Sequence, residues 1–142
     1  MVRRVRRRQP GPHLRGRPGR GDSLDARRRE RAGALSYYGA GPDHEVPVDD
    51  GFFPYAQAKT VADGHLERLE RDAGLAYTVL RPSVLTFVPA THEIDVTGEG
   101  RFSTSRANVA ECIAAAVAHP PTDGRVVEFN DGATPISEVF SR

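Results

Sequence analysis

Residues 74–86, which read GLAYTVLRPSVLT, decide the fold class. The run Ala76–Leu80 is β-prone and is ended by Arg81-Pro82, a pattern typical of a short buried strand. It follows a predicted helix after the two-residue turn Gly74-Leu75. A strand that begins directly after a helix and a short turn indicates a βαβ unit, so the sequence predicts an α/β fold with a parallel sheet.

The helix before this strand is predicted over residues 54–73. Pro54 suits the first turn of a helix, and Gly74 is a typical helix stop. Further upstream, Gly39–Pro42 predicts a loop, and we expect residues 34–38 to hold the end of a buried strand. The helix carries apolar residues at spacings of three or four, which predict a stripe facing the sheet: Ala58, Ala62, Leu66, Leu69 and Ala73.

A second helix is predicted between Ser105, a suitable N-cap, and Pro120. A strand at Val126–Phe129 follows, and Thr134-Pro135 has the form of another helix start. Residues 83–104 look irregular apart from a short strand at 94–96. The predicted order is strand, helix, strand, helix, strand, helix, which gives an incomplete sheet of about three strands. The stripe of the second helix is Val109, Cys112, Ile113, Ala116 and Val117.

Residues 1–33 differ in composition from the rest of the chain. They hold 12 arginines against three acidic residues, a net charge of +9, whereas residues 34–142 carry a net charge of −8. Apolar residues are nearly absent from 1–33, so we expect this segment to be disordered and residues 34–142 to form the domain. Clustered arginines favour a nucleic-acid-binding tail. An inert tail, a linker, or an artefact of a wrong start site or reading frame is the preferred interpretation, because all basic residues there are arginine.

The remaining composition narrows the class of protein. Cys112 is the single cysteine, so no intrachain disulfide can form, and its place in an apolar stripe predicts a buried, inert thiol. No apolar run approaches the roughly 18 residues of a membrane helix, and the basic N-terminus lacks the apolar core of a secretory signal. The histidines at positions 44, 65, 92 and 119 lack metal-site spacing. We therefore expect a cytoplasmic protein without a metal or membrane partner.

Tyr55 and Lys59 form the clearest candidate for chemistry. They stand four residues apart on the predicted helix, so their side chains share a face, and Lys59 is the only lysine of the chain. An ammonium group can lower the pKa of a nearby phenol, which can then exchange a proton with a substrate hydroxyl or carbonyl. The same lysine can bond to a cofactor ribose. The alternative is a surface tyrosine packed against a lysine stem.

An ordered series of segments resembles the atypical short-chain dehydrogenase/reductase family, specifically its NAD(P)H-binding branch of small proteins. The resemblance covers about Leu35 to Arg142, and its most specific pieces are the YTVLRP strand and the SRANVA helix start. The segments are LSYYG (35–39), YAQAK (55–59), GLAYTVLRPSVLT (74–86), SRANVA (105–110) and FNDGATPI (129–136).

The resemblance implies a Rossmann-type fold, NAD or NADP as cofactor, and Tyr55 with Lys59 as the acid/base pair. Ser36 is then the hydroxyl that orients the substrate carbonyl, although that role can instead fall on Tyr37 or Tyr38. The backbone of residues 81–83 (Arg81, Pro82 and Ser83) is expected near the nicotinamide.

The chain departs from this family in its first residues. The family opens with a strand, a glycine-rich turn and a helix that holds the pyrophosphate. Residues 1–33 contain no such unit, because no apolar strand precedes Gly16–Gly21 and no amphipathic helix follows. We therefore expect the C-terminal half of the domain, with impaired cofactor binding.

The predicted function is that of a truncated NAD(P)-dependent oxidoreductase-like protein acting on a small carbonyl or hydroxyl compound. The alternatives are a non-enzymatic NAD(P)-sensing regulator and an Arg-tailed nucleic-acid-binding module. An uncovered sheet edge also predicts self-association.

Overall fold

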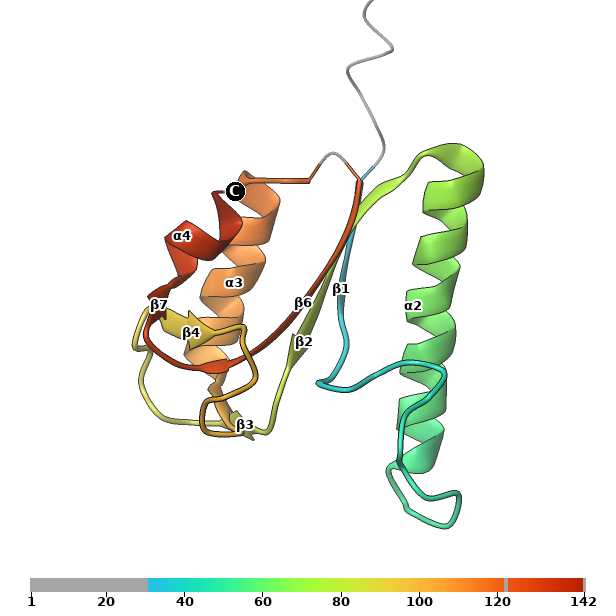
Figure 1. Cartoon of the computed structure of the whole chain (residues 1–142), viewed down its shortest axis with the longest axis horizontal. Helices are drawn as coiled ribbons and strands as arrows, with labels where there is room; N and C mark the ends of the chain where they lie inside the picture. The colour runs from blue at the N-terminus through green and yellow to red at the C-terminus, as the bar shows by residue number, and fades with distance from the viewer. Residues whose placement is uncertain (1–30, 122, 142) are drawn as a thin grey trace, which may run out of the picture.

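The protein is built around one mainly parallel sheet with helices on both faces (Figure 1). The computed structural model describes residues 31–121 and 123–141. The Arg-rich segment predicted to be disordered, its glycine cluster and the proposed nucleic-acid tail therefore lie outside the described residues, except for 31–33. These three residues already belong to the first strand, which begins earlier than the predicted range of 34–38.

Three parallel strands form one side of the sheet, as predicted. In spatial order from the sheet edge inward they are β1 (Arg31–Leu35), β2 (Ala76–Pro82) and β6 (Gly124–Asp131). Two short antiparallel strands, β4 (Glu93–Asp95) and β7 (Thr134–Pro135), extend the sheet beyond β6. A separate pair, β3 (Leu85–Thr86) with β5 (Thr104–Ser105), lies in the stretch predicted to be largely irregular.

The helices are α2 (Phe53–Ala73), α3 (Arg106–Ala118) and α4 (Ile136–Phe140). Two predicted helix ends are confirmed: Gly74 closes α2 with φ 68°, and the Ser105 hydroxyl accepts a hydrogen bond from the Asn108 amide at 2.9 Å. The helix start predicted at Thr134-Pro135 is wrong by one residue, because the N-cap is Pro135 instead of Thr134, and both residues pair as β7. In the described part, no helix is long and apolar enough to cross a membrane.

The apolar core lies between the sheet and the helices α3 and α4 (Figure 1). Of the predicted stripe on α3, Val109 and Cys112 are buried, whereas Ile113 and Val117 are 44% and 76% exposed. The core consists of Leu80, Ile94, Val109, Cys112, Val127, Phe129, Ile136, Val139 and Phe140.

Helix α2 covers the opposite face of the sheet, and its predicted apolar stripe is only partly confirmed: Leu66 and Leu69 are half-buried, whereas Ala58, Ala62 and Ala73 are exposed. The buried residues of the helix are Ala56 and Asp63. Polar contacts add to the packing on this side, because the Asp63 carboxylate pairs with Arg81 of β2 at 2.9 Å. The spacing of alanines misled the prediction, because small side chains fit an exposed helix surface as well as a buried one.

Candidate functional site

A pocket of about 480 Å³ opens beyond the carboxyl ends of β1 and β2, beside the first turn of α2. In parallel α/β sheets, ligands bind at this edge, because loops that follow neighbouring strands meet there. The pocket is lined by the ends of β1 and β2 with the residues that follow them, by the start of α2, and by Phe102 before β5. The lining residues are Leu35, Ser36, Tyr37, Tyr38, Phe52, Tyr55, Pro82, Ser83, Val84, Leu85 and Phe102.

Tyr55 and Lys59 come together at this pocket. The Lys59 Nζ atom lies 5.5 Å from the centre of the Tyr55 ring and donates a hydrogen bond to the Leu35 carbonyl oxygen at 2.6 Å. That bond ties α2 to the last residue of β1. An ammonium group has three donors, so Lys59 keeps hydrogens for other acceptors. Tyr55 itself is 44% exposed and lines the pocket, so a ligand can reach its phenol.

Two hydroxyl groups at the pocket have no hydrogen-bond partner among the described residues. They are the Ser36 Oγ atom, in a side chain that is buried, and the Tyr37 phenol. Burial raises the pKa of the Tyr37 phenol above its usual value; Asp63 and Tyr55 raise it further, and Arg81 opposes them. Tyr37 is therefore a neutral hydrogen-bond donor at ordinary pH. Buried polar groups are nearly always paired in folded proteins, so these two hydroxyls keep an unused capacity for hydrogen bonds beside the pocket.

Arg81 does not present its guanidinium to the pocket. It lies inside β2, and its Nη2 atom contacts Asp63 of α2 at 2.9 Å while Nη1 contacts Glu128 of β6 at 3.2 Å. The carboxylate of Glu128 also accepts from the Gly39 amide at 3.1 Å. This ion-pair network fastens α2, β2, β6 and the loop after β1 together. Asp63 and Glu128 lie far from Arg81 in the sequence, so no local sequence pattern predicted this ion-pair network.

Pro82 and Ser83 line the pocket with a backbone that is held in place. The Pro82 carbonyl accepts from the Tyr38 amide at 3.0 Å, and the Ser83 amide donates to the Phe129 carbonyl at 3.2 Å. The Ser83 hydroxyl lies 3.0 Å from that of Thr104. This rigid strand end suits a ligand-binding edge, while the contact of residues 81–83 with a nicotinamide stays a prediction.

Aromatic rings form one wall of the pocket. Phe52 packs against Tyr37 at 5.1 Å and against Tyr55 at 4.9 Å between ring centres. Phe102, from the segment before β5, packs edge-on against Tyr38 at 5.1 Å. Sequence reasoning missed Phe52 and Phe102. The pair Phe52-Phe53 before Pro54 was a usable signal, whereas Phe102 is brought to the site only by the folding of residues 83–104.

The SRANVA segment has a structural task. The buried Asn108 side chain donates to the Thr91 hydroxyl at 2.9 Å and to Asp131 at 2.7 Å, and its oxygen accepts from the amides of Thr91 and His92. Asp131 also accepts from the Ser105 amide. These bonds fix the connection between β2 and α3, and hence the position of the wall that it contributes to the pocket.

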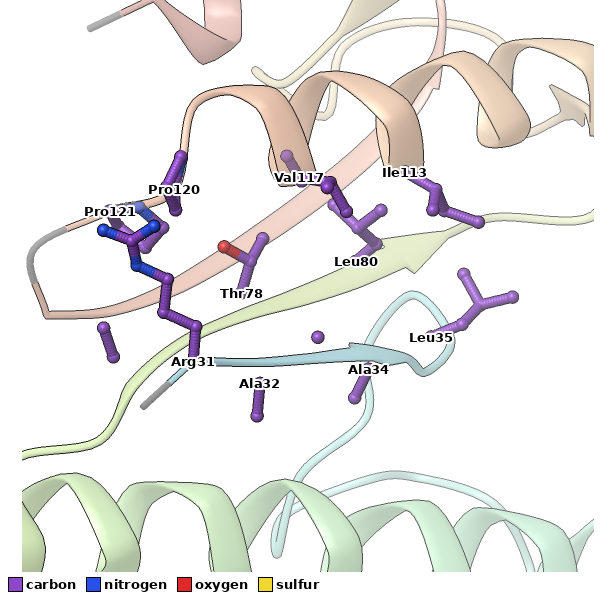
Figure 2. Close-up of a pocket in the computed structure, with 13 residues that line it drawn as sticks. Arg31, Ala32, Ala34, Leu35, Thr78, Leu80, Ile113, Val117, Pro120 and Pro121 are labelled. Atoms are coloured by element: carbon purple, nitrogen blue, oxygen red, sulfur yellow. The ribbon is translucent and has the colours of Figure 1, made fainter. Parts of the chain in front are cut away.

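A second hollow, of about 600 Å³, runs along β1 on the side of α3 (Figure 2). The strand β1 bounds it on one side, with Arg31 and Leu35 turned toward α3 and Ala32 and Ala34 turned away, and the exposed Ile113 and Val117 of α3 lie on the other side. Among the described residues, no strand pairs with the outer edge of β1. This β1 groove lacks a cluster of hydroxyl or acid/base groups comparable to that around Tyr55, so it has the character of an uncovered packing surface.

The remaining reactive side chains lie apart from the pocket. Burial raises the pKa of the Cys112 thiol to about 12, with Glu111 and Asp131 adding to the effect, which agrees with the predicted inert thiol. His92 pairs with Glu111 at 2.7 Å on an exposed surface. The described residues hold no group of three or more His, Cys, Asp or Glu side chains that could bind a metal ion.

Residues 22–120 match a protein-family model described as NAD(P)H-binding. Over 90 residues the chain is 33% identical to "uncharacterized sugar epimerase YhfK" of Bacillus subtilis, a match that spans 63% of this chain and 40% of that protein. Two solved structures resemble it: a provisionally assigned NAD-dependent epimerase/dehydratase of Bacillus halodurans (TM-score 0.66, 31% identity) and the oxidoreductase ylbE of Lactococcus lactis (0.65, 29%). Each match spans 79% of this chain and 51% of the other, so the chain covers about half the length of these relatives.

Proposed function

Since this chain belongs to the NAD(P)H-binding protein family, with NAD or NADP as the family's cofactor, we propose that it is an NAD(P)-dependent oxidoreductase with Tyr55 as its acid/base. The proposal rests on one observation above all. Tyr55 and Lys59 share one face of α2 at the carboxyl edge of the sheet, where the Ser36 hydroxyl lies without a partner. Lys59 is the proposed ribose-binding and positioning partner of Tyr55.

The described residues fit the nicotinamide end of the cofactor. When bound, the nicotinamide supplies or accepts a hydride. Lys59 has donors left for ribose hydroxyls, and the strand ends at Ser36 and Ser83 offer a fixed backbone edge. The pyrophosphate end is a different matter, because no described helix begins at a short glycine-rich turn after a strand: residues 36–52 separate β1 from α2. We therefore expect the chain to bind NAD(P) weakly.

The proposed chemistry of the chain's own groups is a proton transfer. The Tyr55 phenol gives a proton to the oxygen of a carbonyl substrate, or takes one from a hydroxyl substrate in the reverse direction. Ser36 and Tyr37 donate hydrogen bonds to the same oxygen, because their hydroxyls have no other described partner. Lys59, fixed on the Leu35 carbonyl, keeps an ammonium group beside the phenol ring.

The first test is a fluorescence titration of the chain with NADPH and NADH. Replacing Lys59 by Ala is expected to weaken binding by about 10-fold or more, because a hydrogen bond to a charged group contributes roughly 1.5–3 kcal/mol. Arg68→Ala, an exposed change on the same helix, is the matched control. Circular dichroism must show that each variant is folded. Equal affinities of the Lys59 and Arg68 variants for NADPH and NADH would show that Lys59 does not contact the cofactor.

The second test addresses the acid/base. In Tyr55→Phe, NADPH oxidation with a carbonyl substrate is expected to fall at least about 100-fold, the usual contribution of general acid catalysis. NADPH affinity is expected to stay within about twofold. Tyr77→Phe, at the other end of β2, is the control and should keep its activity. Cofactor binding without turnover in the unmodified chain would favour the alternative of an NAD(P)-sensing regulator.

Epimerisation is the competing activity, because two relatives carry that word in their names. We favour simple oxidoreduction for this chain, since none of the described residues that line the pocket has a charged or amide side chain to hold sugar hydroxyls. Inversion of a stereocentre of the substrate without net NADPH oxidation would show that the chain is an epimerase. The proposed nucleic-acid role concerns residues 1–33, of which the structure describes only 31–33; salt-dependent DNA binding lost on deleting this segment would support it.

A second copy of the chain is the partner we propose for the β1 groove. The outer edge of β1 carries backbone donors and acceptors that no described strand uses, and an antiparallel copy of the same strand can pair with them about a two-fold axis. Val117, 76% exposed beside the groove, would then be covered. Sedimentation should show a dimer that Val117→Asp dissociates and Val61→Asp, on α2, does not. A monomer at high concentration would exclude this partner.

A further inference from the structure

We propose that the Tyr55 pocket takes an uncharged aromatic carbonyl compound, an inference that rests on the oxidoreductase function proposed above and names its substrate class. The lining consists of five aromatic side chains, four aliphatic ones and two serines. Pockets of such composition recognise a ligand mainly by removing apolar surface from water, and a few polar groups orient it.

The pocket excludes anionic groups. Among the described lining residues no side chain is charged. Arg81 is shared between Asp63 and Glu128, and Lys59, which donates to the Leu35 carbonyl and is assigned above to the cofactor ribose, is not part of the lining. A phosphate or carboxylate placed among these side chains would lose its hydration without an ion pair from the pocket lining, which is unfavourable.

The polar side-chain groups of the lining are five hydroxyls, and they suit a ligand with few polar atoms. Ser36 and Tyr37 have hydroxyls without a described partner, and Tyr55 is open to the pocket. The Ser83 hydroxyl is already bonded to Thr104. A compound with many hydroxyl groups would leave most of them unpaired against aromatic walls, at a cost for each buried group.

Side chains of the aromatic wall are partly exposed. Phe52 is 42% exposed and Phe102 55% exposed, although both belong to ordered ring pairs with Tyr37 and Tyr38. Val84, whose side chain is 60% exposed, adds to this apolar surface. An aromatic ring inserted between these side chains covers them and gains favourable ring–ring contacts beyond the buried area.

Ligand-observed NMR on the full chain, with and without saturating NADPH, tests the inference with matched probes. The neutral ketone 2-acetylnaphthalene is expected to bind at least about 10-fold more tightly than the anion 2-naphthoate, and glucose is expected not to bind. Phe102→Ala should weaken ketone binding about 2- to 10-fold, as the loss of one ring contact predicts. Phe87→Ala is the control, because Phe87 is 89% exposed and outside the pocket lining.

Three outcomes would overturn the inference: no ketone binding, ketone binding that Phe102→Ala leaves unchanged, or tighter binding of 2-naphthoate that is lost in Arg101→Ala. Arg101 precedes Phe102 and is exposed, so it is the cation available to an anion at the rim. The NADPH titration separates this inference from the function on which it rests. Ketone binding without cofactor-dependent turnover supports the substrate class and contradicts the oxidoreductase, whereas turnover of anions or sugars alone does the reverse.

Discussion

Helices α2 and α3 cover opposite faces of the same sheet, but they are attached to it in different ways (Figure 1). Helix α3 buries Val109 and Cys112 in the apolar core. Helix α2 instead uses Lys59 on the Leu35 carbonyl, Thr60 on the Gly41 carbonyl and Asp63 on Arg81. Apolar packing tolerates small shifts of a helix, whereas hydrogen bonds fix both distance and direction. The helix that carries Tyr55 is therefore the one held by directional contacts.

The difference in attachment predicts different responses to mutation. Contacts of the apolar side should govern global stability, because burial contributes roughly in proportion to area. Contacts of the polar side should govern the position and local stability of α2, because one hydrogen bond contributes only about 0.5–1.5 kcal/mol net.

The largest effect is expected from Phe129→Ala in the core. The fully buried ring lies in β6 between the sheet and α3, and its removal should lower the free energy of unfolding by about 3–5 kcal/mol. Urea denaturation measures the loss. Val126→Ala in the same strand, where the side chain is 40% exposed, should cost less than about 1.5 kcal/mol. Equal losses of unfolding free energy in the two variants would contradict the assignment of Phe129 to the core.

A smaller and more local effect is expected from Asp63→Asn. The change removes the charge that pairs with Arg81 and should cost about 1.5–3 kcal/mol, because the pair is largely buried. Hydrogen exchange should become faster in α2 while α3 keeps its protection. Asp72→Asn, on the exposed face of α2, should change neither helix. Equal acceleration in α2 and α3 would contradict the separate attachment of the two helices.

The smallest effect concerns Tyr77, which lies on the α2 side of β2. Burial raises the pKa of its phenol above the usual value, and Glu67 and Glu70 of α2 raise it further. The neutral phenol is thus favoured in the folded state. Above about pH 10 the unfolded chain loses this proton first, so stability should fall as pH rises toward the folded-state pKa. Between pH 8 and pH 10.5, the free energy of unfolding should decrease less in Tyr77→Phe than in the unmodified chain. An identical decrease in both would show that Tyr77 is not the cause.

The same contrast explains what the sequence could predict. The α/β class, the three parallel strands and the ends at Gly74 and Ser105 follow from periodicity and capping chemistry, which are local properties. The buried face of α2 was predicted only in part, because its polar contacts have partners that lie far along the chain. Asp63 and Arg81 are 18 positions apart, and Arg81 and Glu128 are 47 apart.

The candidate site was predictable to the same extent. The spacing of Tyr55 and Lys59 put both on one helix face, and the resemblance added Ser36 and the strand end. Of the aromatic wall, Phe52 directly precedes the predicted helix and had a usable signal in the pair Phe52-Phe53. Phe102 was not predictable, because it comes from a loop whose course depends on tertiary contacts such as those of Asn108 with Thr91 and Asp131.

The pairing of Asp63 with Arg81 also has an evolutionary consequence. A change of Arg81 alone leaves the buried Asp63 carboxylate without its counter-charge, and a change of Asp63 alone leaves Arg81 with Glu128 as its one described partner. A change at both positions can substitute an apolar contact of similar size at little cost. Selection should then act on the two positions as a unit. Among relatives of this chain, positions 63 and 81 are expected to covary, and intermediates that carry only one of the two charges are expected to be rare.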